Sequence, residues 1–435
     1  MPQGRPAGRP YSHRNLKSAF GGPIDYERIA KKITTVLFLS QSLSSAAFIA
    51  SFTVNALIGF DLTGKQSMAG VPGARYVVGQ ACGAVGWGDS MERIGRRKSI
   101  ALGQVAGVAG SVIASAAIIA RSFPGFLFGL ILVGMARSAV DLGRFAAAEV
   151  HLPEKRGRAI SNVVLGSTVG AIFGPLLVGP MGHFANWLGY PELSGAYIGG
   201  AGVFFTAALL IFGGLRPDPR DVGRELARLD PSSVPRKTTQ TLSEIVRRPG
   251  VIAAIITMAS AQMVMVVPMS ITSVHMKIQQ HPLTSISVVI SAHTLGMYAF
   301  SILSGRMADR KGRGPTIIFG SVILIVSCAM AAPSVSLLPL VIALFLLGLG
   351  WNFAYVAGSA LLSDQLSPGE RSKTQGFNDL VLNFSSGASQ VISGVIFSMG
   401  GYGIMAATAA VLGFMPLAAG MWWQRKGRIS EPANI

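Results

Sequence analysis

Charged residues are scarce in this chain, and their scarcity excludes the common soluble protein classes. Only 13% of the 435 residues are Asp, Glu, Lys or Arg, whereas soluble domains carry about 25%. Hydrophobic residues make up 50% of the chain and the mean hydropathy is +0.50. Apolar runs of about twenty residues with few charges are typical of helices that cross a membrane. We therefore predict an integral membrane protein in contact with the lipid bilayer.

Cysteine is nearly absent. Cys82 and Cys328 are the only two cysteines and both fall within apolar segments. They form neither a disulfide framework nor a CxxC metal motif. The sequence also lacks a nucleophile–base set and a nucleotide-binding glycine loop after a strand. We expect no enzymatic activity and no permanently bound cofactor.

Acidic residues are few, so the net charge is strongly positive. The chain has 19 Asp and Glu against 37 Lys and Arg, a net charge of +18. In a soluble protein this excess suggests nucleic acid binding. Here the basic residues lie between the apolar runs, so membrane topology explains them and we expect no nucleic acid partner.

The apolar runs predict twelve membrane-spanning helices. Runs without two-residue alternation form helices, because only helices and closed barrels satisfy their backbone in lipid. The first six runs lie near 34–58, 72–91, 98–120, 124–149, 158–181 and 194–215. The next six lie near 250–274, 284–307, 314–332, 337–363, 372–399 and 401–424. Because Lys and Arg crowd into alternate loops and both tails, we predict cytoplasmic N and C termini.

The domain organisation follows from these runs. The predicted parts are a cytosolic tail over 1–33, a six-helix bundle over 34–215, a cytoplasmic linker over 216–249, a second six-helix bundle over 250–424 and a cytosolic tail over 425–435. The first tail is polar and basic, and no short apolar region with a cleavage site follows it. We read it as a tail and not as a cleaved signal peptide.

Two loops repeat one pattern of residues. The chain reads GDSMERIGRR from Gly88 and GRMADRKGRG from Gly305. Glu149 near the end of the fourth run likewise mirrors Asp364 near the end of the tenth. The repeats lie about half a chain apart, so the two halves should be related. Internal repeats in a transporter place the cargo between the halves, near the membrane midplane.

The duplicated loop resembles the signature loop of the major facilitator superfamily, with Glu92 in place of the usual Asp. The resemblance implies a gate at the cytoplasmic face and not a cargo site. Gly88 and Gly305 would let helices approach closely, and the charged residues would pair with one another or with helix ends. The predicted gate residues are Gly88, Glu92, Arg93, Gly95 and Arg96 in the first loop and Gly305, Asp309, Arg310, Gly312 and Arg313 in the second.

The fifth run carries four glycines in the sequence GSTVGAIFGPLLVGP, which begins at Gly166. This sequence is similar to the Gly-Pro signature of drug/proton antiporters in the same superfamily. Small residues at four-residue spacing also occur wherever membrane helices pack closely. We favour the packing interpretation.

The fourth and eleventh runs carry ionisable residues that are candidates for coupling to transport. Arg137, Asp141 and Arg144 share one face of the fourth run, and Asp141 lies one turn from an arginine on either side. Ionisable groups at membrane depth are costly and commonly functional. The three residues form either a self-neutralising structural group or part of the transport machinery. Asp379 on the eleventh run has no cation nearby in the sequence and is a candidate proton carrier.

Two pairs at four-residue spacing lie on the seventh and eighth runs. Met265 and Met269 share one helix face, and so do His293 and Met297. The two runs are consecutive and antiparallel, so the pairs could face each other. Thioether and imidazole ligands suit Cu(I), and the absence of any Asp or Glu between Met258 and Asp309 disfavours Mg²⁺ and Ca²⁺. Methionine is also an ordinary filler of apolar cores, so packing alone is the alternative.

These two pairs resemble the ligand signature of the CcoA-like bacterial copper importers within the same superfamily. The resemblance implies copper import across the bacterial inner membrane for cytochrome oxidase assembly, by a carrier that we expect to be monomeric. Met265, Met269, His293 and Met297 would hold the transported copper ion. Relatives of that family carry other cargo, riboflavin among them. An importer of a small organic molecule and a proton-coupled drug exporter therefore remain the alternatives.

Overall fold

The computed structural model describes residues 26–229 and 241–430, and every regular element within them is helical. The helices of the N-terminal half are α1 (Tyr26–Thr63), α2 (Val71–Ile94), α3 (Arg96–Ile119), α4 (Phe123–Glu149), α5 (Pro153–Phe173), α6 (Val178–Trp187) and α7 (Gly195–Gly214). Short 3₁₀ turns lie at η1 (Gln66–Met68), η2 (Pro175–Leu177) and η3 (Glu192–Ser194). The prediction of an all-helical membrane protein is confirmed.

The C-terminal half repeats this plan after two short connecting helices. These are α8 (Pro219–Leu229) and α9 (Leu242–Val246). The half itself consists of α10 (Pro249–Ile278), α11 (Leu283–Tyr298), α12 (Ser301–Lys311), α13 (Arg313–Ala331), α14 (Leu337–Asp364), α15 (Pro368–Leu412) and α16 (Phe414–Ser430). The tight pairing of α3 with α4 recurs as that of α13 with α14.

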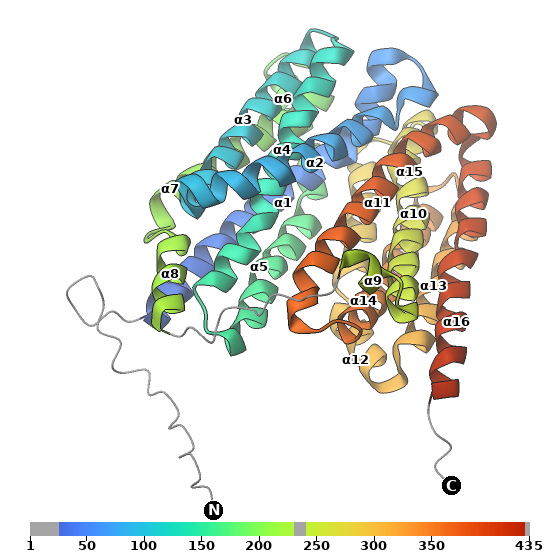
Figure 1. The fold of residues 1–435 in the computed structure, drawn as a ribbon. Helices are drawn as coiled ribbons and strands as arrows, with labels where there is room; N and C mark the ends of the chain where they lie inside the picture. Colours follow the sequence, from blue (N-terminus) through green and yellow to red (C-terminus); the bar gives the residue numbers. More distant parts are fainter. Residues whose placement is uncertain (1–25, 230–240, 431–435) are drawn as a thin grey trace, which may run out of the picture.

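Ten helical runs in the described residues are long and apolar enough to cross a membrane. Helix α2 is not among them. The last run, Lys373–Arg425, is 53 residues long, far more than the roughly 20 residues that one crossing needs. It contains Gly401, whose φ of 71° lies outside the helical region and marks a kink within α15. The chain turns back at one end of the molecule before it descends through α16 (Figure 1).

Glycine ends both predicted gate loops in the same way. Gly95 has φ 96° and ψ 165°, and Gly312 has φ 94° and ψ 162°. This region of backbone conformation is essentially restricted to glycine. Each glycine ends one helix and lets the next begin at once, so the sequence repeat is also a repeat of backbone geometry.

Three predicted boundaries differ from the structure. Helix α1 begins at Tyr26 and not near 34. Its 38 residues extend about 57 Å, which is longer than the roughly 30 Å hydrocarbon core. The apolar run that predicts the crossing therefore covers only part of the helix. The predicted linker contains α8, which forms because Val222 and Leu226 pack into the apolar core of the N-terminal half. The predicted eighth run is interrupted before Ser301, whose hydroxyl donates to the carbonyl of Tyr298.

The glycines of the fifth run serve packing, as favoured from the sequence. A Cβ at Gly166 would lie 2.5 Å from the carbonyl oxygen of Phe38 on α1. At Gly170 the corresponding distance, to the Ser42 carbonyl oxygen, is 2.1 Å. Only glycine lets α5 lie this close to α1.

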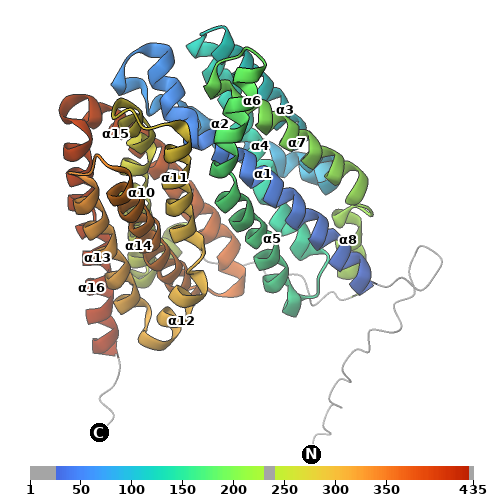
Figure 2. The same cartoon turned by 180° about the vertical axis from the view of Figure 1, so that it is seen from behind.

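The two halves meet at one end of the molecule. Figures 1 and 2 show the halves joined at the end remote from Tyr26 and Ser430 and diverging towards the end where these residues lie. The contacts between halves join η1 and α2 to α15, α1 to α10, and α5 and α6 to α11. We call the contact of η1 and α2 with α15 the seal.

Candidate functional site

Met265 and Met269 lie in the core of the C-terminal half. Their side chains are buried on α10, with 4% and 8% of the residue surface exposed. Pro268 lies between them inside the helix and has no backbone N–H to donate to the carbonyl of Val264. This stretch of α10 is therefore less regular than an uninterrupted helix.

His293 is fully buried on α11 and has a defined hydrogen bond. Its Nδ1 lies 2.9 Å from the carbonyl oxygen of Leu344 on α14. A carbonyl only accepts, so Nδ1 donates, and the neutral imidazole then keeps its lone pair on Nε2. Within the described residues Nε2 is buried and has no hydrogen-bond partner. This is the arrangement in which metal-binding histidines are commonly held, with one nitrogen donating to a carbonyl and the other available.

The two pairs lie at equal sequence distances from the turn of the α10–α11 hairpin. His281 in the connecting turn lies midway in sequence between Met269 and His293, and also midway between Met265 and Met297. Met265 and Met269 belong to one apolar cluster, and Met297 packs against it. Helix α11 nevertheless packs mainly on α14, and α10 packs mainly on α15 and α14. The expectation that α10 and α11 face each other directly thus needs correction, because α14 is the neighbour that both share.

Helix α14 connects α10 to α11 through two consecutive residues. Trp351 donates from Nε1 to Oε1 of Gln262 on α10, at 2.8 Å. Asn352 donates to the carbonyl of Met297, at 2.6 Å. The pairing of Trp351 with Gln262 was not predicted, because it joins residues far apart in the chain. Trp351 also stacks on Tyr355, with ring centroids 4.6 Å apart.

The ionisable residues of α4 do not form a single group. Arg137 pairs with Asp141 at 2.9 Å, and Gln41 on α1 donates to the same carboxylate at 3.3 Å. Arg144 instead reaches Asp379 on α15, at 3.4 Å. The expectation that Asp379 lacks a cation holds only along the sequence, because its partner comes from the other half.

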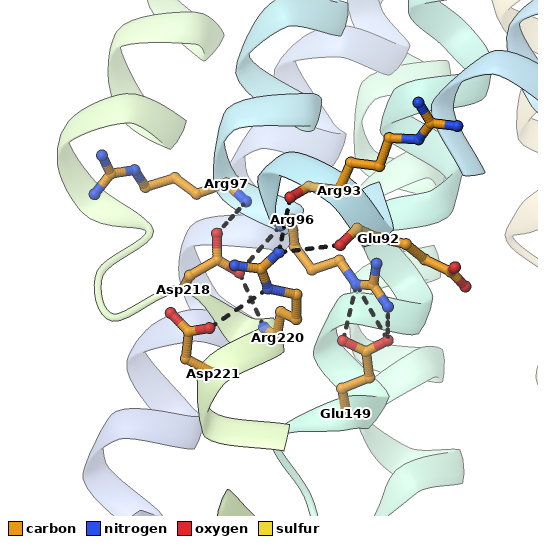
Figure 3. A network of polar contacts seen from close by, with 8 residues as sticks. All are labelled: Glu92, Arg93, Arg96, Arg97, Glu149, Asp218, Arg220 and Asp221. Carbon is orange, nitrogen blue, oxygen red and sulfur yellow. Dashed lines mark hydrogen bonds and ion pairs between the residues drawn. The ribbon is translucent and has the colours of Figure 1, made fainter. Parts of the chain in front are cut away.

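The first predicted gate loop is held by residues of α4 and of the linker. Arg96 pairs with Glu149 at 2.7 Å. Asp218 accepts from the backbone N–H groups of Arg96 and Arg97, each at 3.0 Å (Figure 3). The same carboxylate accepts from the N–H of Arg220 and so caps α8 as well as α3. The sequence analysis missed Asp218, although its position directly before Pro219 is a typical helix start.

The second gate loop repeats the pairing with α14. Arg313 lies 3.0 Å from Asp364 and 2.5 Å from Asp309. The pair of Arg313 with Asp364 corresponds to that of Arg96 with Glu149, which agrees with the sequence repeat.

Other gate residues lie differently from what the sequence suggested. Figure 3 shows the Glu92 carboxylate directed away from Arg96, and Arg93 pairs with Asp89 at 2.9 Å. A Cβ placed at Gly88 or Gly305 meets no atom within 4 Å. The expected close helix approach at these two glycines is therefore not found, because the halves diverge at this end.

A further ion pair at the same end was not anticipated. Arg248, before α10, lies 2.6 Å from the carboxylate of Glu370 in the first turn of α15. The guanidinium hydrogen bond and the backbone N–H of Ser367 lower the pKa of Glu370 to about 2. Glu370 also completes a capping box with Ser367, so one carboxylate fixes the starts of both helices.

The comparisons with known proteins agree on the family. The Major Facilitator Superfamily model matches residues 37–281 and 265–434. The chain is 32% identical to the uncharacterized MFS-type transporter YddS of Bacillus subtilis, over 96% of each chain. It is 27% identical to the riboflavin transporter RfnT of Brucella anthropi, over 86% of this chain and 91% of that one.

The solved structures agree on the fold. A bacterial homolog of the human lysosomal transporter Spinster, in an inward-facing and unoccupied conformation, matches with a TM-score of 0.71 and 14% identity. The match covers 95% of this chain and 100% of that one. The duplicated gate loops, the two helical halves and these matches lead to one conclusion. The chain belongs to the major facilitator superfamily of membrane transporters.

Proposed function

We propose that this protein imports copper across the bacterial inner membrane by alternating access, for cytochrome oxidase assembly. The observation that carries the proposal is His293. A buried imidazole whose Nδ1 is engaged and whose Nε2 has no partner in the described chain requires a reason at this depth. A transported metal ion that binds Nε2 supplies that reason.

The methionines that we propose as ligands select the kind of metal. Met265, Met269 and Met297 provide thioether sulfur, which favours Cu(I) over hard cations. The structure also describes no group of three or more His, Cys, Asp or Glu side chains suited to a metal ion in residues 26–229 and 241–430. The methionine and histidine pairs are thus the metal site that we propose in this part of the chain.

The topology is part of the same proposal. We count twelve crossings by adding α2 to the ten candidate spans and dividing the last one at Gly401. Tyr26 and Ser430 lie at the same end of the molecule, which requires an even number of crossings (Figure 2). The basic loops lie at this end, so we place it in the cytoplasm. The halves meet at the opposite face, which corresponds to an inward-facing carrier.

A small organic cargo such as riboflavin is the second candidate. Its support is the similarity to the riboflavin transporter RfnT over most of both chains. Trp351 stacks on Tyr355 beside the polar side chain of Gln262. Such a pair offers a flat apolar surface next to a hydrogen-bonding group, which suits an aromatic ring system.

Uptake of radioactive copper distinguishes the candidates. Cells expressing the wild type should accumulate copper above the vector control. Met265→Leu and His293→Gln should abolish the excess, because each removes one ligand atom while keeping the side-chain volume similar. Met258→Leu is the matched control, since Met258 is buried on the same helix in a separate apolar cluster.

Each outcome has a defined meaning. Wild-type uptake equal to the vector control refutes copper transport. Copper uptake that survives both ligand substitutions keeps copper as cargo but refutes the site. Riboflavin uptake by the wild type, without copper uptake, establishes the second candidate.

A further inference from the structure

A basic cavity lies where α8 docks on the N-terminal half. It has a volume of about 540 Å³ and is bordered by α2, α3, α4, α5 and α8. Four arginines line it, namely Arg96, Arg156, Arg220 and Arg224. The side chain of Phe145 provides an apolar wall. The cavity is remote from the methionine and histidine pairs, which lie in the other half.

The two acidic residues that border the cavity neutralise only part of its positive charge. Both carboxylate oxygens of Glu149 are hydrogen-bonded to Arg96, at 2.7 to 3.2 Å. The carboxylate of Glu92 extends away from Arg220 in Figure 3. Arg96 is thus paired within the cavity, and Arg220 is paired with Asp221 beside it, at 3.4 Å. The four arginines of the lining still outnumber its two carboxylates, which gives the cavity a positive potential.

Arg220 and Arg224 keep N–H donors for a ligand. Arg220 donates from Nη1 to the carbonyl oxygens of Glu92 and Arg93, at 3.0 and 3.2 Å, which fixes its position. Arg224 is exposed and makes no hydrogen bond or ion pair with any residue that the structure describes. A positioned arginine beside an unpaired one is suited to binding the several oxygens of a phosphate.

The depth of the cavity indicates where such an anion comes from. Arg96 is the first residue of the candidate span Arg96–Ile119, and Glu149 is the last of Phe123–Glu149. The ends of spanning helices lie at the level of the lipid headgroups. We propose that this cavity binds a phosphate-bearing anion, and that an anionic phospholipid headgroup at the membrane surface is its source.

The test uses the purified full-length protein in neutral detergent and native mass spectrometry. Palmitoyl-oleoyl phosphatidylglycerol should bind, and zwitterionic phosphatidylcholine with the same chains should bind more weakly. Arg224→Gln should weaken phosphatidylglycerol binding about tenfold, the effect of losing one charged hydrogen bond. Arg228→Gln is the matched control, because Arg228 lies on the same helix outside the cavity and is 79% exposed.

Two further measurements distinguish loss of the site from misfolding of one variant, and a lipid from a soluble source of the phosphate. Arg156→Gln tests a second cavity arginine, so the result does not depend on one variant. Displacement of the lipid by soluble glycerol 3-phosphate assigns the cavity to a soluble phosphate ester, and its failure assigns the cavity to the lipid. The site is refuted if both lipids bind equally, or if Arg224→Gln and Arg228→Gln weaken binding to the same extent.

Discussion

The seal between the two halves allows no side chain at Gly70. A Cβ built there would lie 1.7 Å from the backbone carbonyl oxygen of Gln390 on α15. Gly70 has φ −82° and ψ −17°, which any residue adopts, so alanine itself causes no backbone strain. Its methyl group meets backbone that cannot rotate away. The substitution Gly70→Ala therefore acts on the contact between the halves and not on α2 itself.

The size of the effect follows from overpacking a close contact. An additional methyl in a well-packed position costs about 1–3 kcal/mol. This corresponds to roughly a 5- to 150-fold lower population of the sealed arrangement relative to the one in which the halves separate here. Gly73→Ala should have a smaller effect, because its Cβ would meet Oε1 of the Gln390 side chain, at 1.4 Å, and that amide can move.

A disulfide across the seal measures this population. The ideal Cβ of Gly387 lies 3.6 Å from the Cβ of Val77, within the range for a disulfide. The pair Val77→Cys and Gly387→Cys is introduced after the exposed Cys82 is replaced by serine. We expect Gly70→Ala to slow cross-linking of this pair by oxidant at least about fivefold.

Gly86→Ala is the matched control for this assay. It adds the same methyl within α2, the helix that Gly70 precedes, at a position with no atom within 4 Å. Cross-linking of Gly86→Ala should match that of the parent pair. If Gly70→Ala also cross-links at the parent rate, the seal is not the packed contact described here and the reasoning fails.

Three further predictions concern the opposite end of the molecule and the contact across the halves. Gly95→Ala should lower the free energy of unfolding by about 1–3 kcal/mol because its φ of 96° suits only glycine; an unchanged thermal midpoint would contradict this. Asp379→Asn and Arg144→Gln should show a coupling of only about 0.2–1 kcal/mol in a double-mutant cycle of thermal stability, since both side chains are about one third exposed, and a coupling of several kcal/mol would indicate a buried pair. Glu370→Gln should destabilise the protein at pH 7. The difference in free energy of unfolding from the wild type should disappear as the pH falls from about 4.3 towards about 2, because a carboxylate with a lowered folded-state pKa stabilises the fold above its unfolded pKa and no longer does so below its folded pKa. A difference that is constant over this range would exclude the carboxylate charge as its cause.

The sequence was informative wherever local chemistry decides the structure. Apolar runs give helices in any membrane setting, because no other open arrangement satisfies the backbone. The pattern from Gly88 and its copy from Gly305 predicted related loops, and Gly95 and Gly312 do share one backbone geometry. The family followed from the same repeat. Helix ends were less accurate, since α1 and α8 extend through polar residues that hydropathy does not recognise.

The candidate site was only partly predictable. The spacing of His293 and Met297 places both on one helix face from helical periodicity alone. The hydrogen bond of His293 to the Leu344 carbonyl could not be foreseen, because every carbonyl has the same chemistry and only packing selects one. The role of Trp351 in reaching Gln262 on α10 is equally a product of the fold.

By itself the sequence determined a helical membrane carrier built from two related halves, since hydropathy, charge bias and repeated spacing are properties of short segments. The tertiary structure decided which charges meet. Arg144 neutralises Asp379 across the halves, and Asp218 of the linker caps α3. It also decided which face is sealed, through Gly70 against Gln390. These contacts join residues more than a hundred positions apart, and only packing of the whole chain brings them within reach.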